Sequence, residues 1–554
     1  MKISTNIVSS LEKCRPDLAP CDYARLEGIS ALGGERINFQ FIVRLEEEKC
    51  FGGEFSVDAE SGLDGLRLRS VKNVYTEFDT FIDDESRESG KFLDYPNRVY
   101  PDILEDMPRN NIVRFHGTLM SFWADIKVPK GTAAGEYSVK FSVKQDGETV
   151  ASDSLKVEVI GTSLAEPDYI CTNWFHVDCL ADYYSVPLYS EEHWRIIESF
   201  MASAFENGIN AILVPVLTPP LDTAIGNYRK TSQLVKISLD NVKYSFDFSL
   251  LDRYIALCKK IGFKYYEISH LFSQWGAKYA PKVVADVTEN GSKTEKRIFG
   301  WDTPGTEGKN PEFLRCFIPA LKEHFSSLGI LDNCIFHISD EPALETLEGY
   351  RAAKNIVGEL LRGVKTVDAC SHAEFFESGL METPVPYDAA MPPFLALDIP
   401  ERWTYYCMTR DGNAPNRAIC YPAYRNRILG TLMYKYNITG FLQWAFNFYY
   451  DKGSLNLINP YTDMSGGGWV NAGDPFVVYP APGGVPYEST RLMVFGEVFS
   501  DLMALKKCEE LCGRDAVISL IDSEQEIDFT HYPAKNEYIL SLRERVNELI
   551  KNAL

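Results

Sequence analysis

The sequence lacks the two features that would attach a chain to a membrane or carry it through one. It has no uninterrupted run of about eighteen apolar residues, the length that a membrane-spanning helix needs. Residues 1–8 contain no apolar stretch long enough for the core of a signal peptide. We therefore expect a cytoplasmic protein without membrane insertion.

Paired cysteines are also missing. The 13 cysteines are an odd number, they are scattered singly, and no two of them form a CxxC pair. This pattern argues against a disulfide framework and against a cysteine-based zinc site. Cys258, Cys316 and Cys334 lie among apolar residues, so we expect buried free thiols.

Positive charge is scarce: 56 Lys and Arg residues face 78 Asp and Glu residues, and the formal net charge is -22. Nucleic acids and anionic membrane surfaces require a basic footprint, so neither is expected as a partner. The glycine-rich segment 465–475 lacks the Lys-Ser or Lys-Thr ending of a phosphate loop, and no predicted strand leads into it. We interpret this segment as a mobile loop beside a ligand-binding site. We expect no cofactor.

What the chain does have is material for large cores, because 45% of its 554 residues are hydrophobic and 13% are aromatic. Residues 1–162 show β-type alternation, for example in 37–43 and 123–129, and turn signals such as Asp146-Gly147 separate the runs. The pattern predicts an antiparallel β-sandwich that serves as an accessory domain.

After a linker at 163–167 the pattern changes to alternating strands and helices. Eight candidate strands lie at 169–174, 211–216, 264–268, 334–339, 365–369, 385–389, 403–407 and 440–445. Eight such units close a barrel, so the predicted fold class is α/β, an N-terminal antiparallel β-sandwich followed by a (β/α)8 TIM-like barrel over residues 168–510. The sixth helix, near 398–402, is the least defined. Residues 511–554 form a C-terminal segment whose terminal helix, 538–554, is expected to pack on the barrel.

Two adjacent carboxylates follow the fourth candidate strand. Asp340 and Glu341 would point to opposite faces if the strand continued, but Pro342 removes a backbone donor and turns the chain out of the sheet. Both carboxylates can then reach the mouth of the barrel, where the less solvated one keeps its proton near neutral pH. The alternative is that these residues only cap the next helix.

Aromatic and polar residues follow other strands and converge on the same end. Each aromatic could instead be an ordinary core residue, but as a set they indicate a platform for a sugar. The candidate substrate-binding residues are Trp174, His176, Asp178, His270, Trp275, Tyr405, Trp444, Asn447 and Asp474.

Four histidines near strand ends raise the possibility of a metal site: His176, His270, His337 and His372. They do not form an HxH ligand pair, and His337 lies within a candidate strand, where a hydrogen-bonded buried histidine is more usual. We therefore expect no metal, although a metal-dependent barrel hydrolase stays an alternative.

Four segments of the chain together resemble glycoside hydrolase family 123, the β-N-acetylgalactosaminidases. They occur in the same order as in that family: Asn173 to Asp178, His337 to Pro342, Gly440 to Ala445, and Gly473 to Pro480 followed by Ser489-Thr490-Arg491-Leu492. The resemblance covers the predicted barrel and extends to the predicted sandwich.

The resemblance implies a retaining hydrolase in which the acetamido oxygen of the sugar attacks its own anomeric carbon. Glu341 would be the general acid and then the base, and Asp340 would hold the acetamido N–H. Trp275, Tyr405 and Trp444 are candidates for the acetamido pocket, and a glycan or glycolipid oligosaccharide is the expected substrate. Ordinary double displacement and a non-catalytic glycan-binding protein stay open as alternatives, and the oligomeric state is unknown.

Overall fold

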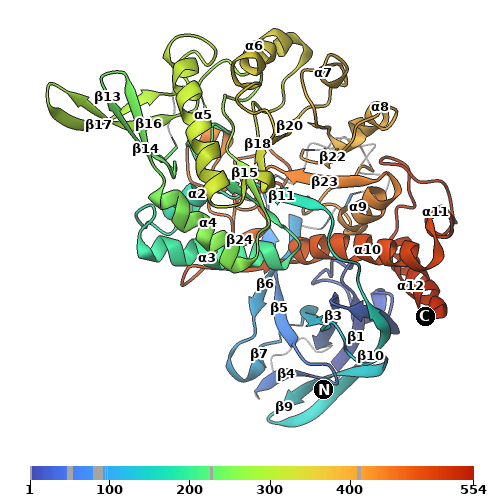
Figure 1. The fold of residues 1–554 in the computed structure, drawn as a ribbon. Coiled ribbons are helices and arrows are strands. Elements are labelled where there is room, and N and C mark those ends of the chain that lie inside the picture. The colour runs from blue at the N-terminus through green and yellow to red at the C-terminus, as the bar shows by residue number, and fades with distance from the viewer. Residues whose placement is uncertain are drawn as a thin grey trace.

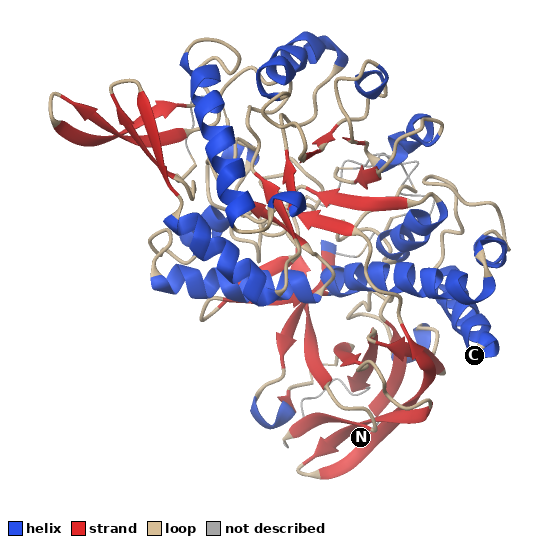
Figure 2. Ribbon diagram, viewed as in Figure 1, coloured by secondary structure: helices blue, strands red, loops and turns tan. Residues whose placement is uncertain are grey.

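The computed structural model describes residues 3–45, 54–78, 92–93, 95, 98–115, 117–224, 229–408 and 413–554. Its amino-terminal strands lie at the bottom of Figure 1 and a mixed α/β region lies above them. The long helix α10 (Thr490–Cys512) runs between the two regions (Figure 1). Figure 2 shows the same division as a lower part made mostly of strands and an upper part in which helices surround strands.

Two β-sheets make up the amino-terminal region. The first has seven strands, in the order β1 (Ile3–Ser9), β3 (Arg36–Leu45), β8 (Met120–Lys127), β5 (Leu66–Tyr75), β6 (Val99–Asp106), β25 (Val485–Ser489) and β24 (Val478–Ala481). The second has five, in the order β2 (Gly28–Gly33), β10 (Glu148–Ser163), β9 (Gly135–Gln145), β4 (Phe55–Ser61) and β7 (Ile112–Val113). Every pairing is antiparallel except that of β2 with β10. The predicted antiparallel β structure is thus confirmed for this region.

The two sheets share one hydrophobic core. Alternate residues of β3, among them Phe39 and Phe41, point into it, and Phe41 stacks on Phe141 of β9 with ring centroids 4.8 Å apart. The intervening Asn38 faces the other way and donates to Glu497 of α10 over 2.9 Å. The strict alternation of β3 therefore produces a dry face toward the second sheet and a polar face toward the carboxy-terminal helices.

A curled parallel sheet forms the centre of the α/β region. Its strand order is β19 (Lys365–Thr366), β18 (Cys334–Phe336), β15 (Tyr265–Ile268), β12 (Ala211–Val214), β11 (Ile170–Asn173), β23 (Ile438–Gln443) and β22 (Arg402–Tyr405). A parallel pair, β20 (Asp368–Ala369) and β21 (Pro384–Val385), lies between its two edges, and Tyr387 forms a parallel bridge to Tyr405. Each of the eight candidate strands overlaps an observed one. The coarse α/β prediction is confirmed, and a closed (β/α)8 barrel stays a prediction.

Helices connect and cover these strands. Their bounds are α2 (Val177–Tyr183), α3 (Glu191–Glu206), α4 (Ser249–Ile261), α5 (Lys309–Ser327), α6 (Leu347–Val357), α7 (Glu374–Glu377), α8 (Met391–Leu395), α9 (Tyr424–Lys435), α11 (Arg514–Ile521) and α12 (Asn536–Ala553), besides α10. The helix predicted near 398–402 is wrong: that stretch holds the start of β22, and the helix is α8, with its prolines in the first turn.

A second sheet, in which β13 and β16 pair in parallel and the other neighbours pair antiparallel, projects from the α/β region at the upper left of Figure 1. It contains β14 (Lys243–Asp247), β13 (Lys236–Asp240), β16 (Val283–Glu289) and β17 (Ser292–Phe299). The sequence analysis did not predict it.

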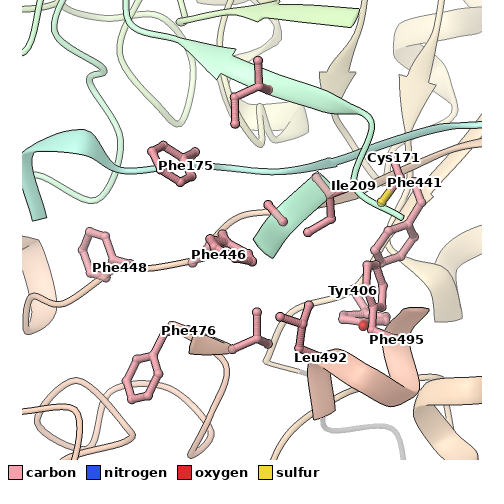
Figure 3. Close-up of a cluster of buried hydrophobic side chains, with 14 of the residues drawn as sticks. Cys171, Phe175, Ile209, Tyr406, Phe441, Phe446, Phe448, Phe476, Leu492 and Phe495 are labelled. Atoms are coloured by element: carbon pink, nitrogen blue, oxygen red, sulfur yellow. The ribbon is translucent and has the colours of Figure 1, made fainter. Parts of the chain in front are cut away.

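The main core includes residues of the parallel sheet, of the helices around it and of α10. Figure 3 shows ten of its labelled side chains, among them Phe441 of β23 facing Tyr406 and Phe495. The ring centroid of Phe441 lies 4.9 Å from that of Tyr406 and 5.7 Å from that of Phe495. Aromatic side chains of this size dominate the burial that holds such layers together.

Buried ion pairs tie the amino-terminal sheets to the carboxy-terminal helices. Arg491 of α10 pairs with Asp102 of β6 over 2.9 Å, and Arg543 of α12 pairs with Glu35 over 2.6 Å. Asn547 of α12 also donates to Ser30 of β2 over 2.8 Å. The terminal helix was expected on the barrel, and it also contacts the first part of the chain.

The described cysteines, twelve in number, are all free thiols. Cys258 and Cys334 are buried as predicted, but Cys316 is exposed because it lies on the outer face of α5. Within the described ranges, no helix combines the length and the apolar character needed to span a bilayer.

Candidate active site

A cavity of about 130 Å³ opens at the carboxyl ends of the parallel strands. Its walls come from the segments that follow β11, β12, β15, β18, β20, β22 and β23, together with the glycine-rich segment. The lining residues are Trp174, Asp222, Gln274, Trp275, Asp340, Glu341, Ala369, Tyr405, Cys407, Met408, Leu442, Trp444, Trp469 and Val470. In parallel α/β folds this end of the strands is where side chains of several loops can meet one ligand.

The backbone after β18 explains how two neighbouring carboxylates reach one cavity. The carbonyl of Asp340 accepts a hydrogen bond from the N–H of Trp275 over 2.8 Å, and the N–H of Glu341 donates to the carbonyl of Ala369 over 3.0 Å. Glu341 has φ of 44°, in the left-handed region that residues other than glycine seldom adopt. This sharp turn, ahead of Pro342, places both side chains on the cavity wall.

Asp340 is the more buried of the two acids, with 4% of its surface exposed, and its Oδ2 accepts from Nε2 of Gln274 over 2.7 Å. Burial and the neighbouring Glu341 raise the pKa of Asp340 well above its usual value. This shift favours the protonated form of Asp340, the less solvated of the two acids.

Glu341 is half-buried, and its Oε1 accepts a hydrogen bond from the hydroxyl of Tyr405 over 2.7 Å. Burial, followed by the adjacent charge of Glu341, raises the pKa of Tyr405 well above 10. The phenol stays protonated at neutral pH and acts as a fixed donor to this carboxylate. The two acids thus have different surroundings, which a proton donor and an anion side by side require.

Tryptophans form much of the remaining wall. Nε1 of Trp174 donates to Glu267 over 2.9 Å, and Nε1 of Trp444 donates to Asp474 over 3.2 Å, so both indoles are held in place from behind. Trp469 of the glycine-rich segment lies 5.8 Å from Trp444, measured between ring centroids. Trp275 differs from these three, because 57% of its surface is exposed.

The structure brings six of the eleven predicted site residues to the cavity: Trp174, Trp275, Asp340, Glu341, Tyr405 and Trp444. The other five, His176, Asp178, His270, Asn447 and Asp474, are buried outside its lining. Contact of those five with a substrate stays a prediction, and their observed contacts are with other side chains and the backbone.

His176 and Asp178 belong to a buried cluster around Arg229. The guanidinium donates to both oxygens of Asp178 over 2.8 Å and lies 3.1 Å from Nδ1 of His176. Burial and Arg229 lower the pKa of His176 to about 3, so its ring is neutral. Asn447 accepts from the backbone N–H of His176 over 2.9 Å and donates to its carbonyl over 3.1 Å. This cluster fixes the segment that follows β11.

Asp474 supports the wall from the opposite side. It accepts from Gln443 and from Trp444 over 3.2 Å each. Burial raises the pKa of Asp474 to about 6, although Arg417 opposes that shift. Its role in the described structure is to orient Trp444.

One group of ligand-type side chains among the described residues could be considered for a metal: His270, His337 and Asp368. Both ring nitrogens of His270 lack hydrogen-bond partners within the described part of the chain. However, the rings of His270 and His337 stack with centroids 4.3 Å apart and an interplanar angle of 20°, so their lone pairs lie in two separate, nearly parallel planes and do not converge on one point between them. Asp368 already accepts from Ile338 and Tyr350, over 2.9 and 2.6 Å. The arrangement does not fit a shared ion.

His337 instead bridges two buried carboxylates beneath the site. Its Nε2 lies 2.7 Å from Glu267 and its Nδ1 lies 3.4 Å from Asp368. Burial alone would lower the pKa of His337, but these two acids raise it to about 10. The imidazolium therefore neutralises part of the negative charge below Asp340.

Asp222, Gln274, Trp469 and Val470 line the cavity although the sequence analysis did not select them. Gln274 directly precedes the predicted Trp275, so its position after β15 was an available signal. Asp222 lies several residues beyond the end of β12, and no periodic pattern fixes where such a loop places its side chains.

Comparison with solved structures gives a full-length match. A family 123 glycoside hydrolase from Clostridium perfringens, described in terms of glycolipid glycan hydrolysis, aligns over 100% of this chain and 98% of its own, with a TM-score of 0.72 and 16% identity. This similarity shows a shared fold.

Two other matches are weaker. A Bacteroides ovatus GH5 xyloglucanase aligns over 86% of this chain and 98% of its own, with 8% identity and a TM-score of 0.27. A GH2 beta-galacturonidase from Eisenbergiella tayi covers 84% of this chain and 69% of its own, with 11% identity and a TM-score of 0.31. Such low TM-scores carry no argument. No curated protein matches the sequence.

The sequence also matches a family model, described as "Glycoside hydrolase 123, catalytic domain", over residues 174–508. The matched range begins at Trp174 and includes all the lining residues of the cavity. It spans more than half of the chain and contains the adjacent carboxylates Asp340 and Glu341. Together with the full-length fold match, this shows that the chain belongs to glycoside hydrolase family 123 and is a glycosidase.

Proposed function

We propose that this glycosidase removes terminal β-linked N-acetylgalactosamine with retention of configuration, and that the acetamido group of the substrate is the nucleophile. The observation that supports this proposal is the placement of Asp340 and Glu341 on one cavity wall in different surroundings. The glycan of a glycolipid or a related oligosaccharide is the proposed substrate.

In this proposal Asp340 accepts a hydrogen bond from the acetamido N–H. Free Asp340 holds a proton because it is buried beside Glu341. A bound N–H donor favours the ionised form of a carboxylate, so substrate binding moves that proton from Asp340 to the neighbouring Glu341. Glu341, on the same wall and more open to solvent, is then the group that carries a proton to the leaving oxygen.

Bond making and breaking then follow from the two charges. The acetamido oxygen attacks the anomeric carbon while Glu341 protonates the departing oxygen, which forms an oxazolinium ion and releases the aglycone. Ionised Asp340 stabilises the positive charge of that ring. Glu341 next removes a proton from water, which opens the oxazolinium ion at the anomeric carbon. The sugar leaves with its original anomeric configuration. Because the nucleophile belongs to the substrate, the distance between the two carboxylates does not predict this outcome as it does in most glycosidases.

Ordinary double displacement is the rival mechanism. It needs an enzyme carboxylate as the nucleophile, and besides Asp340 and Glu341 the only acid in the described lining is Asp222. Activity on sugars with a 2-hydroxyl in place of the acetamide would favour this rival.

A panel of nitrophenyl sugars that differ at C2 and C4 tests the proposal, with a thiazoline analogue of the oxazolinium ion as inhibitor. We expect hydrolysis only of acetamido sugars, faster for the galacto form, and inhibition by the thiazoline. Glu341→Gln and Asp340→Asn should each lose roughly 100- to 10,000-fold in kcat/KM. Glu348→Gln, an exposed acid on α6, is the matched control. A wild-type rate for either site variant would remove that residue from its assigned role.

We further propose that residues 1–162 act as an accessory domain, 168–510 as the catalytic domain, and 511–554 as a carboxy-terminal segment. The parallel strands act as a (β/α)8 barrel, since β20, β21 and the Tyr387–Tyr405 bridge lie between the two edges of the sheet. The protein works in the cytoplasm.

A further inference from the structure

Asp222 is a third acid on the cavity wall, and its backbone is held at both ends. Its N–H donates to Oε1 of Gln274 over 2.7 Å, and its carbonyl accepts from the hydroxyl of Ser454 over 2.7 Å. The carbonyl of the preceding Leu221 accepts from Arg229 over 3.2 Å. The loop after β12 is therefore fixed at this residue.

The fixed backbone is also strained. Asp222 has φ of 48°, in the left-handed region, as do two other residues of the same cavity, Trp275 at 58° and Glu341 at 44°. Such conformations are disfavoured for residues with a Cβ atom and persist where surrounding contacts hold them, which happens most often at ligand sites. The strain at Asp222 thus marks a position that is held for its side chain.

The carboxylate of Asp222 has no hydrogen bond or ion pair to any residue within the described part of the chain, in contrast to its backbone. Burial raises the pKa of Asp222 to about 7; Arg229 opposes this, while Glu341 and Asp474 add to it. A partly buried carboxylate without a partner is costly, and a structural role would normally supply one. Asp222 lines the cavity, so its carboxylate is available to a ligand bound there.

We propose that Asp222 binds hydroxyl groups of the terminal sugar and so helps to set which sugar the enzyme accepts. This inference rests on the proposed function. In that mechanism Glu341 acts at C1 and Asp340 at the C2 acetamide, which leaves the hydroxyls at C3, C4 and C6. A carboxylate accepts two such hydroxyls at once, and each bond to a charged acceptor discriminates strongly.

Gln274 makes this assignment geometrically coherent. One end of its amide accepts from the backbone of Asp222, and the other donates to Asp340 over 2.7 Å. Because the N–H of Asp222 fixes the oxygen of the amide, the NH2 must face Asp340. The group that binds hydroxyls and the group that binds the acetamide are therefore spaced by one rigid side chain.

The test compares kcat/KM of wild type and Asp222→Asn on a parent sugar and on sugars that each lack one hydroxyl. Asparagine keeps the shape and tolerates positive φ, so the backbone should stay in place. We expect kcat/KM on the parent aryl N-acetylhexosaminide to fall roughly 10- to 100-fold. On the 3-, 4- or 6-deoxy sugar that lacks the contacted hydroxyl, wild type and variant should differ less than threefold. Asp286→Asn, which changes a partly exposed acid on β16 that pairs with Lys293, should change neither value.

Additive losses on all three deoxy sugars, or no loss on the parent, would overturn the inference. A covalent glycosyl-enzyme that forms in wild type and not in Asp222→Asn would also overturn it, since Asp222 would then be a nucleophile. The midpoint of thermal unfolding at pH 8 distinguishes a ligand-binding role of Asp222 from a structural one. We expect the midpoint of Asp222→Asn to equal or exceed that of wild type, and a marked decrease in the midpoint would contradict the inference.

Failure of the proposed function is recognised separately. If wild type hydrolyses no N-acetylhexosaminide, calorimetric titration with N-acetylgalactosamine and N-acetylglucosamine replaces the kinetic readout. Binding that is at least tenfold weaker in Asp222→Asn would support the assignment of Asp222 even then. Equal binding, or no binding to wild type, would overturn it.

Discussion

The hydrogen bond from Tyr405 to Glu341 offers the sharpest single test of how the site works. Tyr405→Phe removes one hydroxyl and keeps the ring, which lies against Tyr387 with centroids 6.0 Å apart. Hydrogen bonds to ionised groups contribute about 1.5–3 kcal/mol, so we expect kcat/KM to fall roughly 10- to 150-fold. The free energy of unfolding should change by only about 1 kcal/mol, because the packing of the ring is retained.

The choice of leaving group makes the assay specific. If Tyr405 positions Glu341 as the acid, the loss should be larger for a nitrophenyl or oligosaccharide aglycone than for dinitrophenol, which departs with little proton transfer. Steady-state kinetics on this series, with circular dichroism to follow unfolding, gives both numbers.

The neighbouring tyrosine supplies a matched control. Tyr406 points to the other side of the strand, where its hydroxyl lies 3.4 Å from Asn426 and its ring faces Phe441 (Figure 3). Tyr406→Phe should therefore keep the wild-type rate on every aglycone. Equal losses in the two variants, or a Tyr405→Phe loss that is independent of the leaving group, would refute the role given to Tyr405.

Two further predictions concern buried charge. Arg229→Met leaves Asp178 unpaired in the interior, so chemical denaturation should show a loss of about 3–5 kcal/mol; a loss below 1 kcal/mol would mean that Asp178 finds another partner. Asp222 faces Arg229, Glu341 and Asp474, and its pKa in the folded state, about 7, lies above the unfolded value. The folded state therefore holds the proton longer as pH rises, so the contribution of Asp222 to stability is present below about pH 4 and is lost towards pH 7. The stability of Asp222→Asn relative to wild type should accordingly rise between pH 4 and 8 in urea titrations, and a flat or falling difference would contradict the shift.

The sequence was sufficient to predict the central strands and the position of the two acids at a strand end. Strands such as β12 and β18 are fully buried apolar runs, which sequence patterns identify without knowledge of their neighbours. Asp340 and Glu341 follow β18 within a few residues, and the proline after them limits where the chain can go.

Elements that depend on distant partners were not predictable in this way. β17 is almost wholly exposed and charged, so periodicity did not identify it; the local signal was the turn Asn290-Gly291, with φ of 51° and 79°, which joins β17 to β16. β25 pairs with β6, which lies in the other region of the chain. Pairing of this kind depends on tertiary contacts, which local propensity does not encode.

The same limit applies to side chains after strand ends. His176 and Trp174 are two residues apart, yet Trp174 lines the cavity and His176 lies in the Arg229 cluster. Which of them faces the ligand depends on α2 and on the loop that carries Arg229. Sequence position identifies the residues that follow the strand ends. Which of these side chains line the cavity depends on tertiary packing.

The pairing of β25 with β6 has a consequence for synthesis of the protein. During translation the first sheet emerges with β6 as its open margin, and that margin finds its neighbour only when nearly the whole polypeptide has left the ribosome. Until then an unpaired row of backbone donors and acceptors is presented to other chains. We therefore expect fragments that end before β24 to self-associate, and we expect the two halves of the molecule to acquire their native form together.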